Sequence, residues 1–139
     1  MLECLILGDS IAVGTHNVRP ECVAYAKDGI NSWQWNKMWL KQDLSTEVVV
    51  ISLGSNDHKY VHTETELVKI RKRVKGKRVY WILPHDNNPK SGVSIEEIQR
   101  IVDRIARLNG DVVLPITHVQ KDNIHPSWVG YKQIGDSAR

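Results

Sequence analysis

The sequence has no phenylalanine, only two cysteines and no apolar run long enough to span a membrane. The two cysteines, Cys4 and Cys22, are too few to build the disulfide framework of a small secreted domain. Both lie inside apolar segments, which predicts buried free thiols. The N-terminal residues also lack the basic stretch and the small-residue cleavage site of a leader. Together these absences predict a soluble protein that is made in the cytoplasm.

Phosphate-binding and metal-binding motifs are also absent. The sequence contains neither a Gly-x-Gly-x-x-Gly motif nor a Gly-Lys-Ser/Thr loop, which argues against nucleotide binding. Its six histidines lack the spacing of common zinc sites, so we expect no metal and no cofactor. The formal net charge of +3 is too small to indicate a nucleic-acid-binding protein by itself.

One basic run, from Lys69 to Arg78, departs from this mild balance. The interpretation that we favour is a solvated helix face followed by a loop, because charge runs usually just solvate a surface. The alternative is an anion-binding patch, whose mark would be salt-dependent attachment to nucleic acid. We therefore expect no nucleic-acid partner.

What the sequence does contain is an alternation of short apolar strands with helical segments. The expected strands are Leu2–Leu7, Glu21–Ala26, Glu47–Leu53, Arg78–Leu83 and Asp111–Leu114. The expected helices are Ser32–Lys41, Thr63–Val74 with a Thr63-x-x-Glu66 capping box, Ser94–Leu108 with a Ser94-x-x-Glu97 box, and a last one capped by Ser127. The alternation predicts one α/β domain over residues 1–139, a three-layer α/β/α sandwich around a parallel sheet of about five strands.

Reactive side chains follow four of these strands. Ligand sites in parallel sheets lie at the carboxyl ends of the strands. The segments found there are Gly8-Asp9-Ser10, Asp28-Gly29-Ile30-Asn31, Gly54-Ser55-Asn56-Asp57 and Asp122-Asn123-Ile124-His125-Pro126. They offer a hydroxyl, glycine amides, a side-chain amide and a carboxylate with an imidazole, which acyl transfer requires.

Each group has a definite task in that chemistry. Ser10 needs an adjacent base to become a nucleophile, and His125 is suited to that role near neutral pH. Asp122 is placed to accept the other ring N–H of His125 and fix its tautomer. The oxyanion of the intermediate needs prearranged donors, which the backbone N–H groups of Ser10 and Gly29 and the Asn56 amide could supply.

These segments resemble the blocks of a known family. Gly8-Asp9-Ser10-Ile11 resembles the nucleophile block of the SGNH (GDSL-like) hydrolases, and Gly29 falls where that family has its second-block glycine. Gly54-Ser55-Asn56-Asp57 is similar to the third block, and Asp122-x-x-His125 to the last. The resemblance implies a flavodoxin-like sheet with strand order 2-1-3-4-5 and metal-free hydrolysis of esters or thioesters.

Simpler roles compete with these assignments. Ser10 could only cap a helix, and Asn56 and Gly29 could only shape turns. Gly14 is a second candidate for the second-block glycine, although its place in the chain favours Gly29. We interpret Asp9 as a structural residue that accepts hydrogen bonds from loop amides.

Three further side chains are candidates to line the substrate cleft. They are Trp33 near the Gly29 loop, His85 after the fourth strand and Trp128 beside His125. Trp35 and Trp39 share a helix face and are expected to pack in the core. The predicted function is hydrolysis of a short acyl ester, an acetyl group above all, on a small molecule or a carbohydrate. The alternatives are a thioesterase or lysophospholipase, or a binding module without catalysis.

Overall fold

The computed structural model describes residues 3–139 and contains a five-stranded parallel sheet in the order β2-β1-β3-β4-β5. The strands are β1 (Cys4–Gly8), β2 (Val23–Ala26), β3 (Ser45–Ser52), β4 (Lys75–Ile82) and β5 (Val112–Leu114). The expected α/β class and strand order are confirmed. Leu2, the first residue of the predicted first strand, lies outside the described residues.

Alternating side chains of the strands pack into two separate cores, one on each face of the sheet. Leu5 and Leu7 of β1 belong to one core, and Ile6 belongs to the other together with Cys4. A strand that buries both faces reads as a continuous apolar run rather than as alternation. The run Val48–Ile51 in β3 has this character and is buried throughout.

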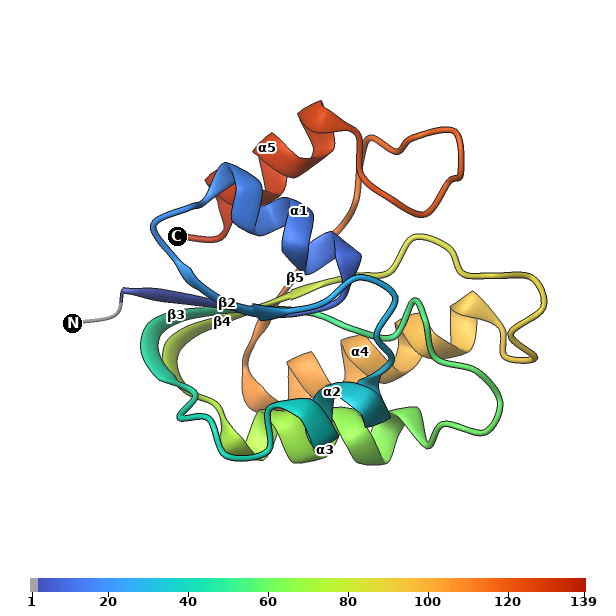
Figure 1. Ribbon diagram of the computed structural model, residues 1–139, viewed down its shortest axis with the longest axis horizontal. Helices are drawn as coiled ribbons and strands as arrows, with labels where there is room; N and C mark the ends of the chain where they lie inside the picture. Colours follow the sequence, from blue (N-terminus) through green and yellow to red (C-terminus); the bar gives the residue numbers. More distant parts are fainter. Residues whose placement is uncertain (1–2) are drawn as a thin grey trace.

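Helices cover both faces of the sheet, which gives three layers (Figure 1). The helices are α1 (Ser10–Val18), α2 (Ser32–Met38), α3 (Thr63–Arg73), α4 (Ile95–Asn109) and α5 (Trp128–Ser137). Figure 1 shows α1 and α5 on one face and α2, α3 and α4 on the other. Trp35 of α2 is fully buried and Trp39 packs beside it, as predicted.

The predicted N-terminal caps form at two helices and not at a third, although that helix does begin at Thr63 as predicted. Ser94 and Ser127 accept hydrogen bonds from Glu97 N and Gly130 N, as N-caps do. The Thr63-x-x-Glu66 capping box does not form, because the Thr63 hydroxyl donates to Asp57 instead. The helix begins after His62, which makes no side-chain cap.

The basic run lies on the last turns of α3 and the first half of β4, not on a helix and a loop. Several of its members hold the fold together. Arg71 makes a bidentate ion pair with Asp111, and Arg73 donates to the carbonyl oxygens of Trp39 and Gln42. Lys69 and Lys72 stay exposed on α3.

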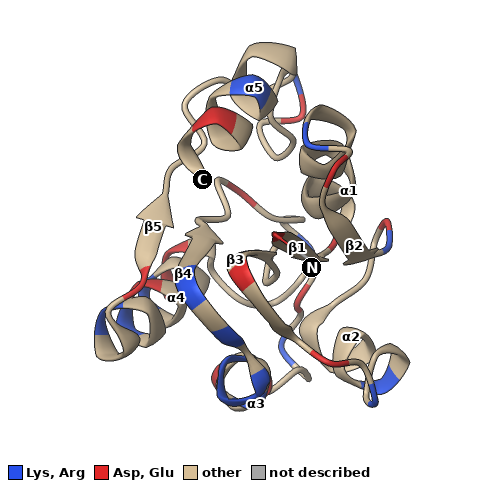
Figure 2. Cartoon of the chain, turned by 90° about the vertical axis from the view of Figure 1, so that its left-hand side faces the viewer, with Lys and Arg blue, Asp and Glu red and all other residues tan. Residues whose placement is uncertain are grey.

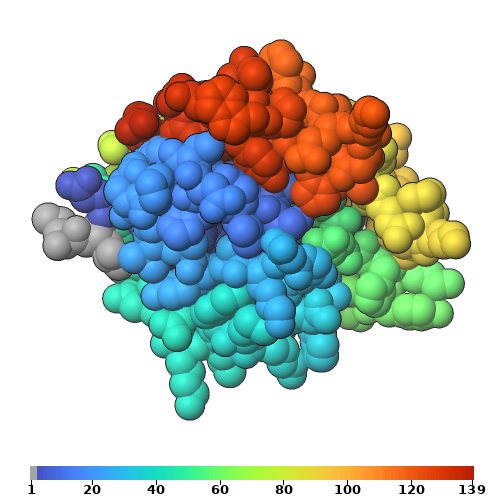
Figure 3. Space-filling view, turned by 45° about the horizontal axis from the view of Figure 1, so that its top comes forward, coloured from blue at the N-terminus to red at the C-terminus, as the bar shows by residue number. Residues whose placement is uncertain are grey.

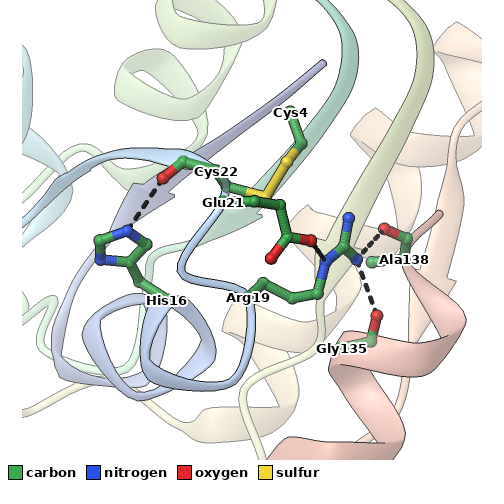
Figure 4. Close-up of a disulfide and its surroundings, with 7 residues drawn as sticks. All are labelled: Cys4, His16, Arg19, Glu21, Cys22, Gly135 and Ala138. Atoms are coloured by element: carbon green, nitrogen blue, oxygen red, sulfur yellow. Dashed lines mark hydrogen bonds and ion pairs between the residues drawn. A yellow bond between two sulfur atoms is a disulfide. The ribbon is translucent and has the colours of Figure 1, made fainter. Parts of the chain in front are cut away.

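Cys4 and Cys22 form a disulfide, so the prediction of free thiols is wrong. Their Cα atoms are 4.8 Å apart because β1 and β2 are neighbours and Leu5 pairs with Val23. Figure 4 shows the disulfide beside Arg19, whose guanidinium donates to Gly135 O and Ala138 O at the end of α5. This corner therefore joins β1 to β2 and α1 to α5, at the end of the sheet away from Ser10.

Loss of this disulfide is expected to destabilise the fold without changing the end of the sheet that carries Ser10. Closing a loop of this length stabilises a protein by roughly 3 kcal/mol through the unfolded chain, so Cys4→Ser with Cys22→Ser should lower the Tm by about 10 °C. Thermal unfolding of the double variant and of reduced wild type measures the effect. An unchanged Tm would show that the cross-link does not contribute to stability.

Within residues 3–139, none of the helices combines the length and the apolar character that crossing a bilayer requires.

Candidate active site

Ser10, His125 and Asp122 form one hydrogen-bonded chain, although Ser10 and His125 are 115 positions apart in the sequence. Ser10 Oγ lies 2.7 Å from His125 Nε2, and His125 Nδ1 lies 2.5 Å from Asp122 Oδ2. Ser10 begins α1 directly after β1, whereas the other two residues lie between β5 and α5. Figure 3 shows the orange segment, which includes Asp122 and His125, lying against part of the blue segment, which includes Ser10.

Gly8 and Asp9 fix the turn that presents Ser10. Gly8 has a φ of +143°, and a Cβ on it would lie 1.9 Å from the carbonyl oxygen of Ser52. Only glycine permits this approach of β1 to β3. Asp9 is the N-cap of α1 and accepts from Ile11 N at 3.0 Å, so Ser10 is not the cap and its hydroxyl is left to His125.

Asp122 is held in place by the backbone of its own loop. Its Oδ1 accepts from Ile124 N and His125 N, while its Oδ2 faces the imidazole. The hydrogen bond from His125 is the largest cause that lowers the pKa of Asp122 to about 2. A carboxylate that stays ionised orients the ring and stabilises its protonated form.

The loop after β4 also contacts the turn that carries Asp122 and His125. Asn123 has a φ of +63° and is the one non-glycine residue with positive φ within residues 3–139. Its carbonyl oxygen bonds His85 Nδ1 at 2.7 Å and its side chain donates to Asp86 Oδ2 at 3.0 Å. Asp86 O in turn accepts from Ser55 Oγ, so the loops after β3, β4 and β5 are connected. His85, predicted to line the cleft, here contacts the turn that carries Asp122 and His125.

No sequence-family model matches this chain, and no curated protein matches it in sequence. Solved structures nevertheless match its fold over nearly the whole length. A member of the lipolytic G-D-S-L family from Veillonella parvula superposes with a TM-score of 0.69 at 15% identity, covering 99% of this chain and 96% of the other. The C-terminal catalytic domain of peptidoglycan O-acetyltransferase A from Streptococcus pneumoniae superposes with a TM-score of 0.70 at 18% identity, covering 98% and 89%. The chain has the SGNH hydrolase fold.

A third solved structure of similar fold is a mutant of an acetyl-xylooligosaccharide esterase from Geobacillus. It superposes on this SGNH fold with a TM-score of 0.63 at 18% identity, covering 98% of this chain and 91% of the other. Likenesses at such identities establish the backbone architecture. The chemistry of this chain has to be argued from its own side chains.

In this SGNH fold, Gly29 and Asn56 lie on neighbouring loops at the carboxyl end of the sheet. Gly29 follows β2 with a φ of +75°, and Asn56 follows β3. Asn56 Nδ2 donates to Ile30 O at 3.2 Å, which holds the two loops together. Gly14, the alternative glycine, lies inside α1, where its Cα faces the ring of Tyr131.

Asp57 organises this part of the SGNH fold, and the sequence interpretation gave it no role. Its fully buried carboxylate accepts from Ser32 N, Ser32 Oγ and Thr63 Oγ1 at 2.6–2.9 Å. It thereby joins the first turns of α2 and α3 to the loop that carries Asn56. A buried aspartate is costly unless it is hydrogen-bonded. In the sequence, Asp57 lies between two predicted helices that begin with hydroxyl side chains, and this was the signal that could have indicated its structural role.

The two tryptophans predicted to border the cleft are exposed. Trp33 is 49% exposed and Trp128 is 70% exposed. Trp33 lines a groove of about 500 Å³ together with the Gly29 loop. Trp128 starts α5 three residues after His125, and Lys132 Nζ lies over its ring, 5.5 Å from the ring centroid.

Asp9 is the other ionisable group next to Ser10. It is buried, and its Oδ2 has no hydrogen-bond partner among the described residues, while Oδ1 accepts from Ile11 N and Ser52 Oγ. Burial raises the pKa of Asp9 to about 7. The prediction that Asp9 is a structural acceptor agrees with these contacts.

This raised pKa predicts that stability falls as the pH rises. In the unfolded chain Asp9 ionises near pH 4, so the folded protein holds the extra proton between about pH 4 and pH 7. Wild type should therefore lose up to a few kcal/mol of unfolding free energy across that window, and Asp9→Asn should not. Urea unfolding of both proteins at pH 5 and pH 8 measures the difference. Parallel pH profiles would contradict the prediction.

Proposed function

We propose that this protein is a serine ester hydrolase that acts through an acyl-serine intermediate. The observation that carries the proposal is the 2.7 Å hydrogen bond between Ser10 Oγ and His125 Nε2, with Asp122 behind the imidazole. A serine that only capped a helix would turn its hydroxyl toward the backbone, and in this chain Asp9 caps α1 instead.

The proposed reaction has two stages. Ser10 Oγ attacks the ester carbonyl carbon while His125 Nε2 takes the hydroxyl proton, and the resulting imidazolium gives that proton to the leaving alcohol. The N–H groups of Ser10 and Gly29 and the Asn56 amide stabilise the oxyanion. In the second stage His125 takes a proton from water as the water attacks the acyl carbon, and returns it to Ser10 Oγ as the bond to serine breaks and the carboxylic acid leaves. Asp122 keeps the imidazole in the required tautomer throughout.

For the substrate, we propose a short acyl group, acetyl above all, carried by a carbohydrate. Two of the three structures of similar fold described above are named for acetyl esters or O-acetyl transfer on glycans. Exposed Trp33 next to the Gly29 loop offers a flat apolar face for a sugar. A thioester or a lysophospholipid is the alternative within the same chemistry.

The disulfide bears on where the protein works. Disulfides persist mainly in oxidising surroundings, and Cys4 and Cys22 are linked at the edge of the sheet. This counts against the cytoplasmic location predicted from the sequence, and we propose an extracytoplasmic one. Alkylation of free thiols in protein taken directly from its source cells tests this, because a cytoplasmic protein would be alkylated at both cysteines.

The function is tested with p-nitrophenyl esters from acetate to octanoate. We expect turnover that is fastest with acetate and falls as the acyl chain lengthens. Comparable rates on an acyl-CoA or a lysophospholipid would favour the alternative substrates. No turnover of any ester by folded wild type would reject the proposal in favour of a binding module.

The Asn56 amide is expected to act on the transition state. Removing one oxyanion donor lowers kcat by about 10²–10³-fold, so Asn56→Ala should lose that much kcat with little change in KM. Asn56→Asp keeps the size but replaces the donor with a carboxylate, and should be at least as slow. A loss confined to KM would show that Asn56 only positions the substrate.

A further inference from the structure

Three hollows adjoin at Trp33, and one of them is lined by Gly29 of the proposed active site. The first, about 500 Å³, includes Gly29 and Lys37, and the second, about 450 Å³, lies between α2 and α3. The third, about 360 Å³, extends toward Tyr60. Trp33 lines all three. We call the residues that line them the Trp33 surface, and it extends from the Gly29 loop along the groove between the two helices.

Cations dominate the Trp33 surface. Its basic members are Lys27, Lys37, Lys69, Lys72 and Arg73. Figure 2 shows how lysines and arginines gather on α3. The acidic members are Asp28 and Glu66, and Glu66 is buried with its Oε1 accepting from Asn36 Nδ2 at 2.8 Å.

The exposed ammonium groups are available to a ligand. Lys69 is 62% exposed and lies 3.9 Å from Glu66, a weak pair for a solvated lysine. Lys37 Nζ lies over the Trp33 ring, 5.1 Å from its centroid. The aromatic face and the charge therefore occur side by side, which suits a ligand that has an apolar face and anionic groups.

We propose that the Trp33 surface binds a carboxylate-bearing polysaccharide whose acyl ester enters the site at Ser10. This rests on the proposed function and narrows its substrate from carbohydrate esters to esters of acidic glycans. A glycan has hydroxyl groups that carry acyl esters, and a nucleic acid has no such ester for Ser10 to attack. A long lipid chain would place hydrocarbon against several ammonium groups and remove their water. Burying unpaired charges in this way is unfavourable, so the surface does not suit a lipid.

The test compares two polymers and a small ester. The polymers are O-acetylated polygalacturonate and neutral O-acetylated glucomannan of equal acetyl content, and the small ester is p-nitrophenyl acetate. At low salt we expect a higher kcat/KM on the acidic polymer, and this advantage should disappear by about 0.5 M NaCl, where charges are screened. Equal kcat/KM on the two polymers at low salt would overturn the inference.

Charge-reversal variants locate the effect. Lys69→Glu with Lys72→Glu should lower kcat/KM on the acidic polymer by about tenfold or more and leave p-nitrophenyl acetate unchanged. The matched control is Lys75→Glu with Arg100→Glu, which changes the net charge equally at exposed positions outside the Trp33 surface. An equal loss of kcat/KM in the control would show that net charge alone causes the effect, and would overturn the inference.

Binding separates this inference from the proposed function. Unacetylated oligogalacturonate should quench the tryptophan fluorescence of wild type, less so in the Lys69→Glu, Lys72→Glu variant. Binding without any ester turnover would reject the proposed esterase function but support an acidic glycan as the ligand. Turnover of p-nitrophenyl acetate without binding would support the esterase function and overturn this inference. Tighter binding of an oligothymidylate of equal charge would replace the glycan with a nucleic acid and overturn the inference.

Discussion

Replacing Ser10 with alanine is expected to lower kcat on p-nitrophenyl acetate by about 10⁴- to 10⁶-fold, because the reaction loses its nucleophile. His125→Ala should fall into the same range, since an unassisted hydroxyl is a weak nucleophile near neutral pH. The two residues act as a unit through their 2.7 Å hydrogen bond, so the double variant should be little slower than either single one. Steady-state kinetics of the three variants measure this.

Control measurements must show that these variants lose catalysis rather than their fold. Asp9 rather than Ser10 caps α1, so Ser10→Ala should keep its Tm within about 2 °C of wild type. Ser137→Ala, at an exposed serine on the last turn of α5, should retain full activity. Multiplicative losses in the double variant would mean that Ser10 and His125 do not share one step.

The largest effect on stability is expected from Gly8→Ala. The new Cβ would lie 1.9 Å from Ser52 O and 3.2 Å from Ala12 Cβ, and the residue would keep a φ of +143°. Ser52 O also accepts the hydrogen bond from Asp9 N, so the clash falls on the turn that presents Ser10. We expect a loss of about 4 kcal/mol or more in unfolding free energy, or no folded protein at all.

Gly110→Ala is the matched comparison for Gly8. Gly110 also has a positive φ, +70°, yet no atom lies within 4 Å of where its Cβ would be. It should cost only about 1 kcal/mol, the penalty of the left-handed backbone alone. Chemical denaturation of both variants gives the difference in unfolding free energy. A similar loss of stability in the two would show that β1 and β3 can move apart enough to accept a Cβ at position 8.

The parallel sheet and the chemical groups at the strand ends were predictable from the residue pattern, whereas the strand order was implied only by the resemblance to the SGNH hydrolases. Buried parallel strands are apolar throughout, as β3 is, and parallel connections return every strand with its carboxyl end on the same edge. Residues as distant as Ser10 and Asp122 therefore had to be considered together. The hydrogen bonds that link these two residues through His125 depend on side-chain placement, which periodicity does not specify.

Other features depend on which strands and loops become neighbours. Cys4 and Cys22 are each unremarkable in the sequence, and pair because β1 lies beside β2. The same holds for Thr63, whose pattern fits a capping box but whose hydroxyl meets a better acceptor in buried Asp57. Asn123 offers no local signal for its contacts with the loop after β4. In each case a tertiary contact decides what the local pattern left open.

The most direct measurement is covalent labelling by a fluorophosphonate probe, read by mass spectrometry of the intact protein and of its peptides. A serine activated by His125 should take up one equivalent of the probe, and peptide analysis should place it on Ser10. The His125→Ala variant should remain unlabelled over the same time although it is folded. Folded wild type that takes up no probe, or takes it up at a residue other than Ser10, would contradict the proposed chemistry.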